Sequence, residues 1–338
     1  MHSGKNFSFQ EVIFWTRRDI YSLLLIGAVP TFCYEVLGWT WLSIPWLPIA
    51  LLGTAVAFVV GFKNNASYDR MWEARRAYGA IVNASRSWGI LVKDFITNEQ
   101  AKTPLNQDEL TAIKHQLISR HFAWLTALRH QLREARVWEA IYKKHNQEFK
   151  DKWFSVHEHK HDMKHDLMNY LSAEELDDVL SKSNKAAQII ALQSSQLKKL
   201  LDLGLIEDFR HMELQKLLIE FYNQQGVTER IKNFPYPRQY ATLNLYFIKI
   251  FILLLPLGML QEFDKLNEIW LVIPFSALSG WIFTTLEKIG ESTESPFEGS
   301  ANDVPITAIS RNIEIDLREM FGMQNIPAPL KPENNILT

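Results

Sequence analysis

The sequence predicts an all-α membrane protein in which two helical hairpins cross the bilayer and a large helical region lies between them. The 338 residues are 47% hydrophobic and include 11 Trp and 20 Phe, yet the mean hydropathy is only −0.12. This average hides a divided chain. Glu35 is the only charged residue between Ile20 and Phe62, residues 63–238 are densely charged, and residues 239–286 are again largely apolar. Such a division indicates membrane segments joined to a polar body.

Four stretches approach the roughly 20 apolar residues that a membrane-spanning helix needs. They are residues 20–42, 46–62, 239–260 and 269–286. Two of them are at the short limit, and Lys249 interrupts the third, so buried helices of a soluble protein are the alternative. An intramembrane charge such as Lys249 is usually functional or paired.

The distribution of charge predicts the orientation of both hairpins. The turn at 38–45 has no charge, and the turn at 261–268 has three acids and only Lys265. Basic residues flank the opposite ends: Arg17, Arg18, Lys63, Arg70, Arg75, Arg76, Arg230, Lys232 and Arg238. By the positive-inside rule, both termini and the middle region lie in the cytoplasm of a multi-pass membrane protein. The N-terminus lacks the pattern of a cleaved signal peptide, so the membrane helices themselves would direct insertion.

The polar region 63–238 is predicted to be helical, with breaks near residues 103–104 and 144–160 and at Gly204 and Gly226. Capping-box spacing marks helix starts at Asn106 and Ser172. A buried stripe is predicted from Ile118, Phe122, Leu125 and Leu128. No proline interrupts residues 64–95, so the second membrane helix is expected to continue into this body as one rod, and Pro235 and Pro237 mark the return to the membrane. We expect one domain over residues 1–338, ending in a cytosolic segment 287–338 with an irregular tail.

Three residues of the second span form a candidate ion constriction. Thr54, Phe58 and Phe62 recur every four residues, so on a helix they lie on one face and present two phenyl rings to a common axis. Ordinary packing of the two phenylalanines is the alternative.

The sequence offers little support for other functions. It contains no phosphate-binding glycine loop, HExxH pair, nucleophile elbow or kinase signature, and we expect neither an enzyme nor a cofactor. The net charge of −2 without a basic stripe excludes a nucleic-acid partner, and the single Cys33 excludes an internal disulfide. His157, His161 and His165 have the spacing of one helical face and are candidate zinc-type ligands, although a solvated polar loop or helix tip explains the run more simply.

Three blocks resemble the bestrophins, especially their bacterial members. They are GFKNNASYDRMWEARRAYG at 61–79, FPYPRQYA at 234–241 and SPFEGSANDVP at 295–305. The resemblance implies a homopentameric channel in the lipid bilayer, with five copies of the second span around a narrow neck. The neck positions here are Thr54, Phe58 and Phe62, where Thr54 replaces the usual large aliphatic residue. A second, cytosolic constriction would fall at Phe209, with Ile206 as the neighbouring candidate.

The resemblance also identifies a segment to compare with a calcium site, because animal bestrophins hold calcium after the last membrane helix. The matching segment keeps Asp303, with Glu298 and Glu294 nearby, but has serines at Ser292, Ser295 and Ser300. Calcium takes about six to eight oxygen ligands with several carboxylates, so this segment predicts a depleted site. Asp303 and Asn302 are better explained as caps of the turn before Pro305.

The charge of the conducted ion is not fixed by the spacing of the neck residues. Phenyl edges in the neck favour an anion and phenyl faces favour a cation, and the family contains both kinds of channel. Phe58 is typical of the anion-conducting branch, so the prediction is a passive channel for a small monovalent anion such as chloride. The alternatives are a monovalent-cation channel of the same fold and a membrane-anchored scaffold. A secondary transporter is less favoured because the repeated broken helices are missing.

Overall fold

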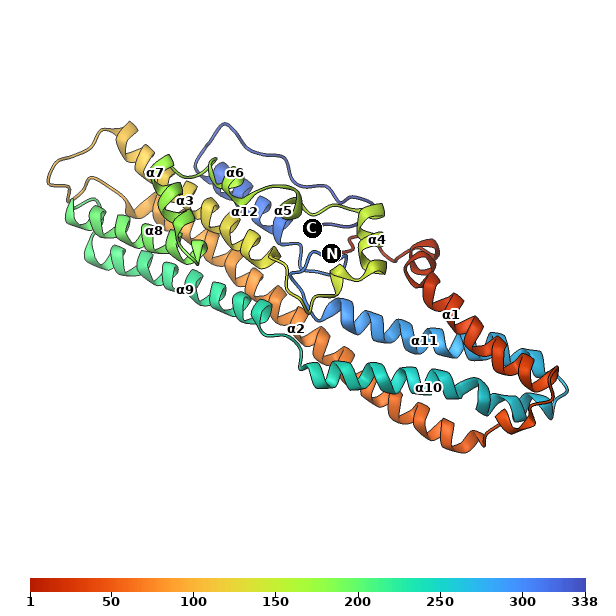
Figure 1. Cartoon of the computed structure of the whole chain (residues 1–338). Coiled ribbons are helices and arrows are strands. Elements are labelled where there is room, and N and C mark those ends of the chain that lie inside the picture. Colours follow the sequence, from red (N-terminus) through yellow and green to blue (C-terminus); the bar gives the residue numbers. More distant parts are fainter.

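The computed structural model describes residues 1–338, and one very long helix organises it. Helix α2 runs from Trp46 to Phe95, 50 residues without a break, a length of about 75 Å. Its first part belongs to an apolar bundle and its second part to a polar body, as Figure 1 shows. The predicted rod is confirmed. The only β-type contacts are isolated bridges of Ile336 with His2 and with Glu333.

The apolar bundle consists of the first part of α2 with α1 (Phe9–Glu35), α10 (Arg238–Asp264) and α11 (Val272–Thr293). Helix α1 packs along α11, and α2 packs against α10 and α11. A small core fills the bundle, formed by Leu23, Ile49, Val56, Val60, Ile248, Phe251, Ile252, Leu255 and Ala277. Gly27 permits the close approach of α1 and α11, because a Cβ atom there would lie 2.6 Å from the Ser276 hydroxyl.

Three segments are long and apolar enough to cross a membrane: Thr40–Phe95, Arg238–Asp264 and Ile269–Thr293. The first predicted span, residues 20–42, is not one helix. Helix α1 ends at Glu35, and a separate 3-10 turn, η1, covers Thr40–Leu42. Gly38 adopts a left-handed φ of 68°, a conformation in which glycine avoids the steric cost of a side chain. The last predicted span likewise begins with a 3-10 turn, η3 (Ile269–Leu271), before α11.

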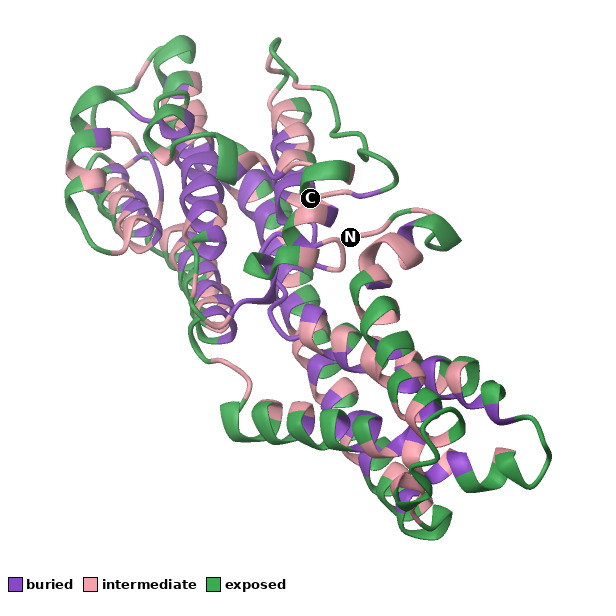
Figure 2. Cartoon of the chain, turned by 45° about the vertical axis from the view of Figure 1, so that its right-hand side comes forward, coloured by how far each residue is buried: buried purple, intermediate pink, exposed green.

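The polar body packs α3 (Gln107–Arg133), α8 (Lys185–Asp202), α9 (Asp208–Asn233) and α12 (Ile306–Met320) with the second part of α2. The connection from α3 to α8 holds η2 (Ala140–Tyr142) and the short helices α4 (Lys144–Trp153), α5 (His157–Lys160), α6 (Met163–Leu167) and α7 (Ala173–Ser181). Figure 2 shows that buried residues concentrate inside this body, whereas the outer faces of the apolar bundle are largely exposed. Exposed apolar faces suit contact with lipid or with other subunits.

Most local predictions for the body are confirmed. Both capping boxes form, at Asn106 with Glu109 and at Ser172 with Glu175, and the stripe of Ile118, Phe122, Leu125 and Leu128 is buried. The predicted break at Gly204 is confirmed, because this residue lies between α8 and α9 and has a left-handed φ of 74°. The predicted break at Gly226 is wrong, because α9 continues through it. The cost of a helical glycine, about 1 kcal/mol, is outweighed there by tertiary contacts such as the hydrogen bond from the Trp124 indole to Gln225, 2.9 Å.

His121 makes the core of the body sensitive to acid. Its ring is buried beside Trp124 and Phe221, and one ring nitrogen lies 2.9 Å from the Ser85 hydroxyl. Burial lowers the pKa of His121 to about 3 from an ordinary value of 6.5. Because the folded-state pKa is the lower one, the unfolded chain takes up the proton first, so stability is complete above pH 6.5 and falls as the pH drops toward 3.

We therefore expect His121→Phe to reduce the loss of stability between pH 7 and pH 5.5 by about 1.4 kcal/mol, the value of one pKa unit. Guanidinium unfolding at the two pH values measures the difference. Ser85→Ala keeps the imidazole and should retain the parent's acid dependence. An identical pH dependence in His121→Phe and the parent would contradict the assignment.

Candidate ion pathway

The candidate neck residues lie on an unpartnered face of α2. Thr54 is exposed, and Phe58 and Phe62 are 65% and 72% exposed. The opposite face buries Val56 and Val60 in the bundle core. Ordinary packing within the subunit therefore does not account for the two phenylalanines. The Thr54 hydroxyl donates to the Ala50 carbonyl, 3.0 Å away, a common bond for a helical threonine.

The exposed face continues beyond the apolar bundle. Asn65, Asp69, Trp72 and Arg76 follow Phe62 at intervals of three or four residues, and all are exposed. This spacing keeps them along one side of the helix. A single face of α2 thus passes from apolar side chains in the bundle to polar ones beside the body.

A buried ion pair holds the back of the neck helix. Lys63, directly after Phe62, is only 3% exposed and donates to Glu287 of α11, which also accepts from Asn244 of α10. Removing one member of such a pair leaves a buried charge without a partner, which is strongly destabilising. Lys63 and Glu287 therefore fix how α2 presents Phe62. The sequence does not reveal this pair. The position of Lys63 at the end of a span indicates only a basic residue that flanks the membrane.

Phe209 and Ile206, the two candidates for the second constriction, have opposite environments. Phe209 is 80% exposed in the first turn of α9, whereas Ile206 is 3% exposed and belongs to the core. The Thr97 backbone N–H donates to the Leu205 carbonyl at 3.0 Å. The start of α9, which carries Phe209, therefore lies near the C-terminal end of α2.

Asp303, the acid that the predicted calcium segment keeps, is satisfied by protein groups. Asp303 accepts from the Ser300 hydroxyl at 2.5 Å, the Gly299 N–H at 2.6 Å and the Arg133 guanidinium at 2.9 Å. This pattern confirms that Asp303 caps its turn. Because Arg133 and the turn already use both of its oxygens, the carboxylate does not fit the oxygen-rich shell that calcium requires.

Each of the two nearby glutamates is engaged through one oxygen, while Oε1 of Glu298 and Oε2 of Glu294 are buried without a hydrogen-bond partner. Glu298 is buried and accepts from the Ala140 N–H at 2.9 Å. Burial, followed by the charges of Asp303 and Glu139, raises the pKa of Glu298 well above its ordinary value. Glu294 pairs with Arg238 at 2.6 Å. A carboxyl group that favours its neutral form and another paired with arginine leave a poor set of calcium ligands.

The predicted histidine face does not form. Helix α5 ends at Lys160, His161 has an extended backbone, and α6 starts at Met163. His157, His161 and His165 therefore do not share one helical face. His157 instead lies 2.8 Å from Asp166, while the His165 side chain is 74% exposed. Helices as short as α5, with four residues, and α6, with five, have too few internal hydrogen bonds to continue as one helix through residues 161–162.

A membrane bundle whose central helix continues into a polar body, with one face left uncovered throughout, is the architecture of a channel protein rather than of an enzyme. The chain belongs to the bestrophin family of ion channels. The family's sequence model, described as Bacterial/Fungal Bestrophin protein, matches residues 11–319.

Curated relatives and solved structures agree with this family. The chain is 26% identical over 317 residues to the voltage-dependent anion channel-forming protein YneE of Escherichia coli strain K12, covering 94% of this chain and 88% of that one. It is 25% identical over 323 residues to the voltage-dependent anion channel-forming protein RSc3414 of Ralstonia nicotianae, covering 93% and 92%. A crystal structure of a bacterial bestrophin homologue from Klebsiella pneumoniae has a TM-score of 0.73 at 24% identity, over 93% of this chain and all (100%) of the other. The last likeness establishes the fold.

Proposed function

We propose that this protein is a homopentameric channel that conducts small monovalent anions, chloride above all, passively across the inner membrane. The observation that carries the proposal is the uncovered face of α2, on which Phe58 and Phe62 are exposed and polar residues follow in the same register. Five such faces around an axis form a neck of two aromatic rings that opens into a polar vestibule. Thr54 makes the outer end of this neck more polar than an aliphatic residue would.

The anion preference rests on two supports. The relatives described above carry the name of anion channel-forming proteins. In addition, a phenyl ring has a positive edge, so rings turned edge-on toward the axis stabilise an anion that has shed part of its water. Phe209 supplies the second constriction, at the cytosolic end of the vestibule.

The orientation that we propose places both termini and the whole body in the cytoplasm. Ser3 bonds to the Asn335 carbonyl at 2.9 Å, so the two ends of the chain meet on the body. Arg17, before the apolar part of α1, pairs with Glu148 of α4 at 2.5 Å. These contacts agree with the positive-inside rule. Because α2 is shared by bundle and body, the whole chain acts as one domain.

A cation channel of the same fold is the second candidate, and one observation favours it. Asp69 is exposed on the α2 face that begins with Thr54. Rings of acidic side chains concentrate cations in a pore. Arg76, exposed further along the same face, opposes this effect.

A reversal-potential measurement tests the proposal. With the purified protein in a planar bilayer under a potassium chloride gradient, we expect the current to reverse near the chloride equilibrium potential. Reversal near the potassium potential would replace the anion channel by the cation channel. Purified pentamers without any current would favour a membrane-anchored scaffold.

A further inference from the structure

We infer that the segment between α4 and α7 contains a transition-metal site, formed by His157, His161 and Asp166, that takes Zn²⁺ or an ion of similar chemistry. One ligand atom from each of the three residues lies within 4.8 Å of the others. The two imidazole rings are stacked with their centroids 4.2 Å apart. If the two rings tilt out of this stack, the three donors can reach the spacing of a zinc coordination shell, in which bonds to nitrogen and oxygen are about 2.0–2.2 Å long.

The donor set selects the class of ion. Two imidazole nitrogens and one carboxylate suit zinc and its neighbours, whereas calcium and magnesium prefer shells made of oxygen. His161 makes no side-chain hydrogen bond, while His157 and Asp166 lie 2.8 Å apart. On metal binding His157 exchanges this hydrogen bond for coordination, and Asp166 stays beside it as the third ligand.

A supporting residue for the carboxylate is already in place. His130, buried near the end of α3, has its Nε2 atom 2.9 Å from Oδ2 of Asp166. Ligating carboxylates in metal sites are commonly held by such an outer hydrogen bond, which fixes the direction of the carboxylate. Asp166 itself is buried. The site therefore joins a rigid helix to an otherwise irregular segment.

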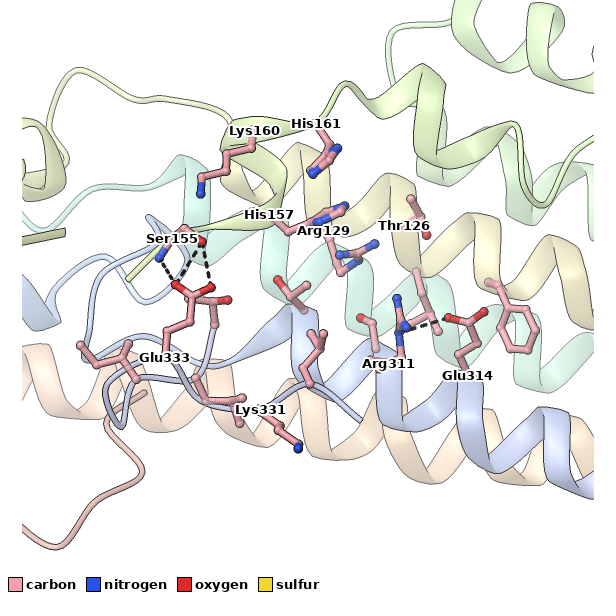
Figure 3. Close-up of a pocket in the computed structure, with 18 of the residues that line it drawn as sticks. Thr126, Arg129, Ser155, His157, Lys160, His161, Arg311, Glu314, Lys331 and Glu333 are labelled. Atoms are coloured by element: carbon pink, nitrogen blue, oxygen red, sulfur yellow. Dashed lines mark hydrogen bonds and ion pairs between the residues drawn. The ribbon is translucent and has the colours of Figure 1, made fainter. Parts of the chain in front are cut away.

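The site also has room for a further ligand. His157 and His161 line a cavity of about 320 Å³ together with Arg129 and Lys160, and Figure 3 shows the two imidazoles over this cavity. Three protein ligands with the fourth position open are typical of zinc sites that bind water or another small ligand.

Binding would stabilise the short helices of the connection. Neither α5, with four residues, nor α6, with five, is stable by itself. A metal ion linking His157 of α5 and the adjoining His161 to Asp166 of α6 would fasten both helices to α3 through His130. This inference does not depend on the ion that the pore conducts.

The test uses the tag-free, full-length protein in detergent after removal of metal with a chelator. Titration with Co²⁺, followed by visible absorption, and with Zn²⁺, followed by calorimetry, should show one ion per subunit and a rise in the unfolding temperature. We expect His161→Ala and Asp166→Asn to lower the affinity at least tenfold. His130→Leu, which removes the supporting bond and keeps the three ligands, should cost about 10–100-fold.

His159→Ala is the matched control, because His159 is an exposed histidine of α5 that is not one of the three clustered ligands. Its affinity should equal that of the parent. No ion bound by the parent, an undiminished affinity in Asp166→Asn, or an equal loss in His159→Ala and His161→Ala would each overturn the inference. His161 is exposed, so a loss of affinity in His161→Ala does not come from unfolding.

Discussion

Replacing Phe58 and Phe62 together by alanine is expected to raise the single-channel conductance about tenfold and to weaken ion selectivity. The proposed neck is narrow and apolar. Such a constriction opposes conduction because it is poorly hydrated, and an ion has to lose water to pass through it. Truncation of both aromatic rings widens the neck and lowers the barrier. A barrier lower by about 1.4 kcal/mol corresponds to a tenfold rate. Planar-bilayer recordings measure both conductance and reversal potential.

Because these residues are exposed, a change in conductance can be assigned to the neck and not to loss of the subunit's fold. Phe58 and Phe62 are 65% and 72% exposed within the subunit, so their truncation leaves no cavity in its core. Phe32 of α1 is the matched control, since it is 49% exposed on a helix that packs against α11. Phe32→Ala should conduct like the parent. Unaltered currents in the double variant, or the same change in Phe32→Ala, would show that the neck has been assigned to the wrong residues.

The fold was predictable where local sequence determines local structure. The change of polarity after Phe62, without a proline, predicted the continuous α2, and Asn106 with Glu109 predicted the start of α3. Local signals failed where tertiary contacts decide. Gly226 lies in the middle of α9 because its neighbours are held by α2 and α3, and the apolar run after Glu35 leaves the helix at Gly38.

The site was predictable only in part, for a related reason. Four-residue spacing was enough to place Thr54, Phe58 and Phe62 on one face. The ion pair that fixes this face joins residues 224 positions apart, and no pattern in one sequence connects them. The histidine cluster shows the same limit: spacing selected His165, whereas the chain bend after His161 brings Asp166 to His157 instead.

A buried network of charges joins the body to the segment after α11. Arg133, at the end of α3, is 1% exposed in its side chain and bonds to Asp303 at 2.9 Å. Its Nε atom lies 3.9 Å from Glu158. Glu158 also pairs with Arg129 and accepts from the Thr307 hydroxyl at 2.8 Å. Arg133 therefore neutralises acids from two segments that are distant in sequence.

Arg133→Met is expected to lower the free energy of unfolding by about 3–5 kcal/mol, because it leaves Asp303 and Glu158 buried with less positive charge. Burial alone would raise the pKa of Glu158, but Arg129 and Arg133 outweigh it and hold the pKa at about 2 instead of 4.5. Since the folded-state pKa is the lower one, this stabilisation is complete above pH 4.5 and is lost as the pH falls toward 2. In Arg133→Met the pKa of Glu158 rises, so less of the stabilisation is present at neutral pH and acid unfolding begins at a higher pH.

Guanidinium unfolding at pH 7, followed by tryptophan fluorescence of the body, measures the effect, and acid titration locates the shift. Arg86→Met is the matched control, because it removes an arginine–aspartate pair of 2.8 Å with Asp316 whose arginine side chain is 54% exposed. Exposed pairs contribute about 0–1 kcal/mol, so the control should unfold almost like the parent and keep its acid midpoint. Equal losses in the two variants would mean that the buried charge of Arg133 contributes no more than an exposed ion pair, and that Asp303 and Glu158 do not depend on it.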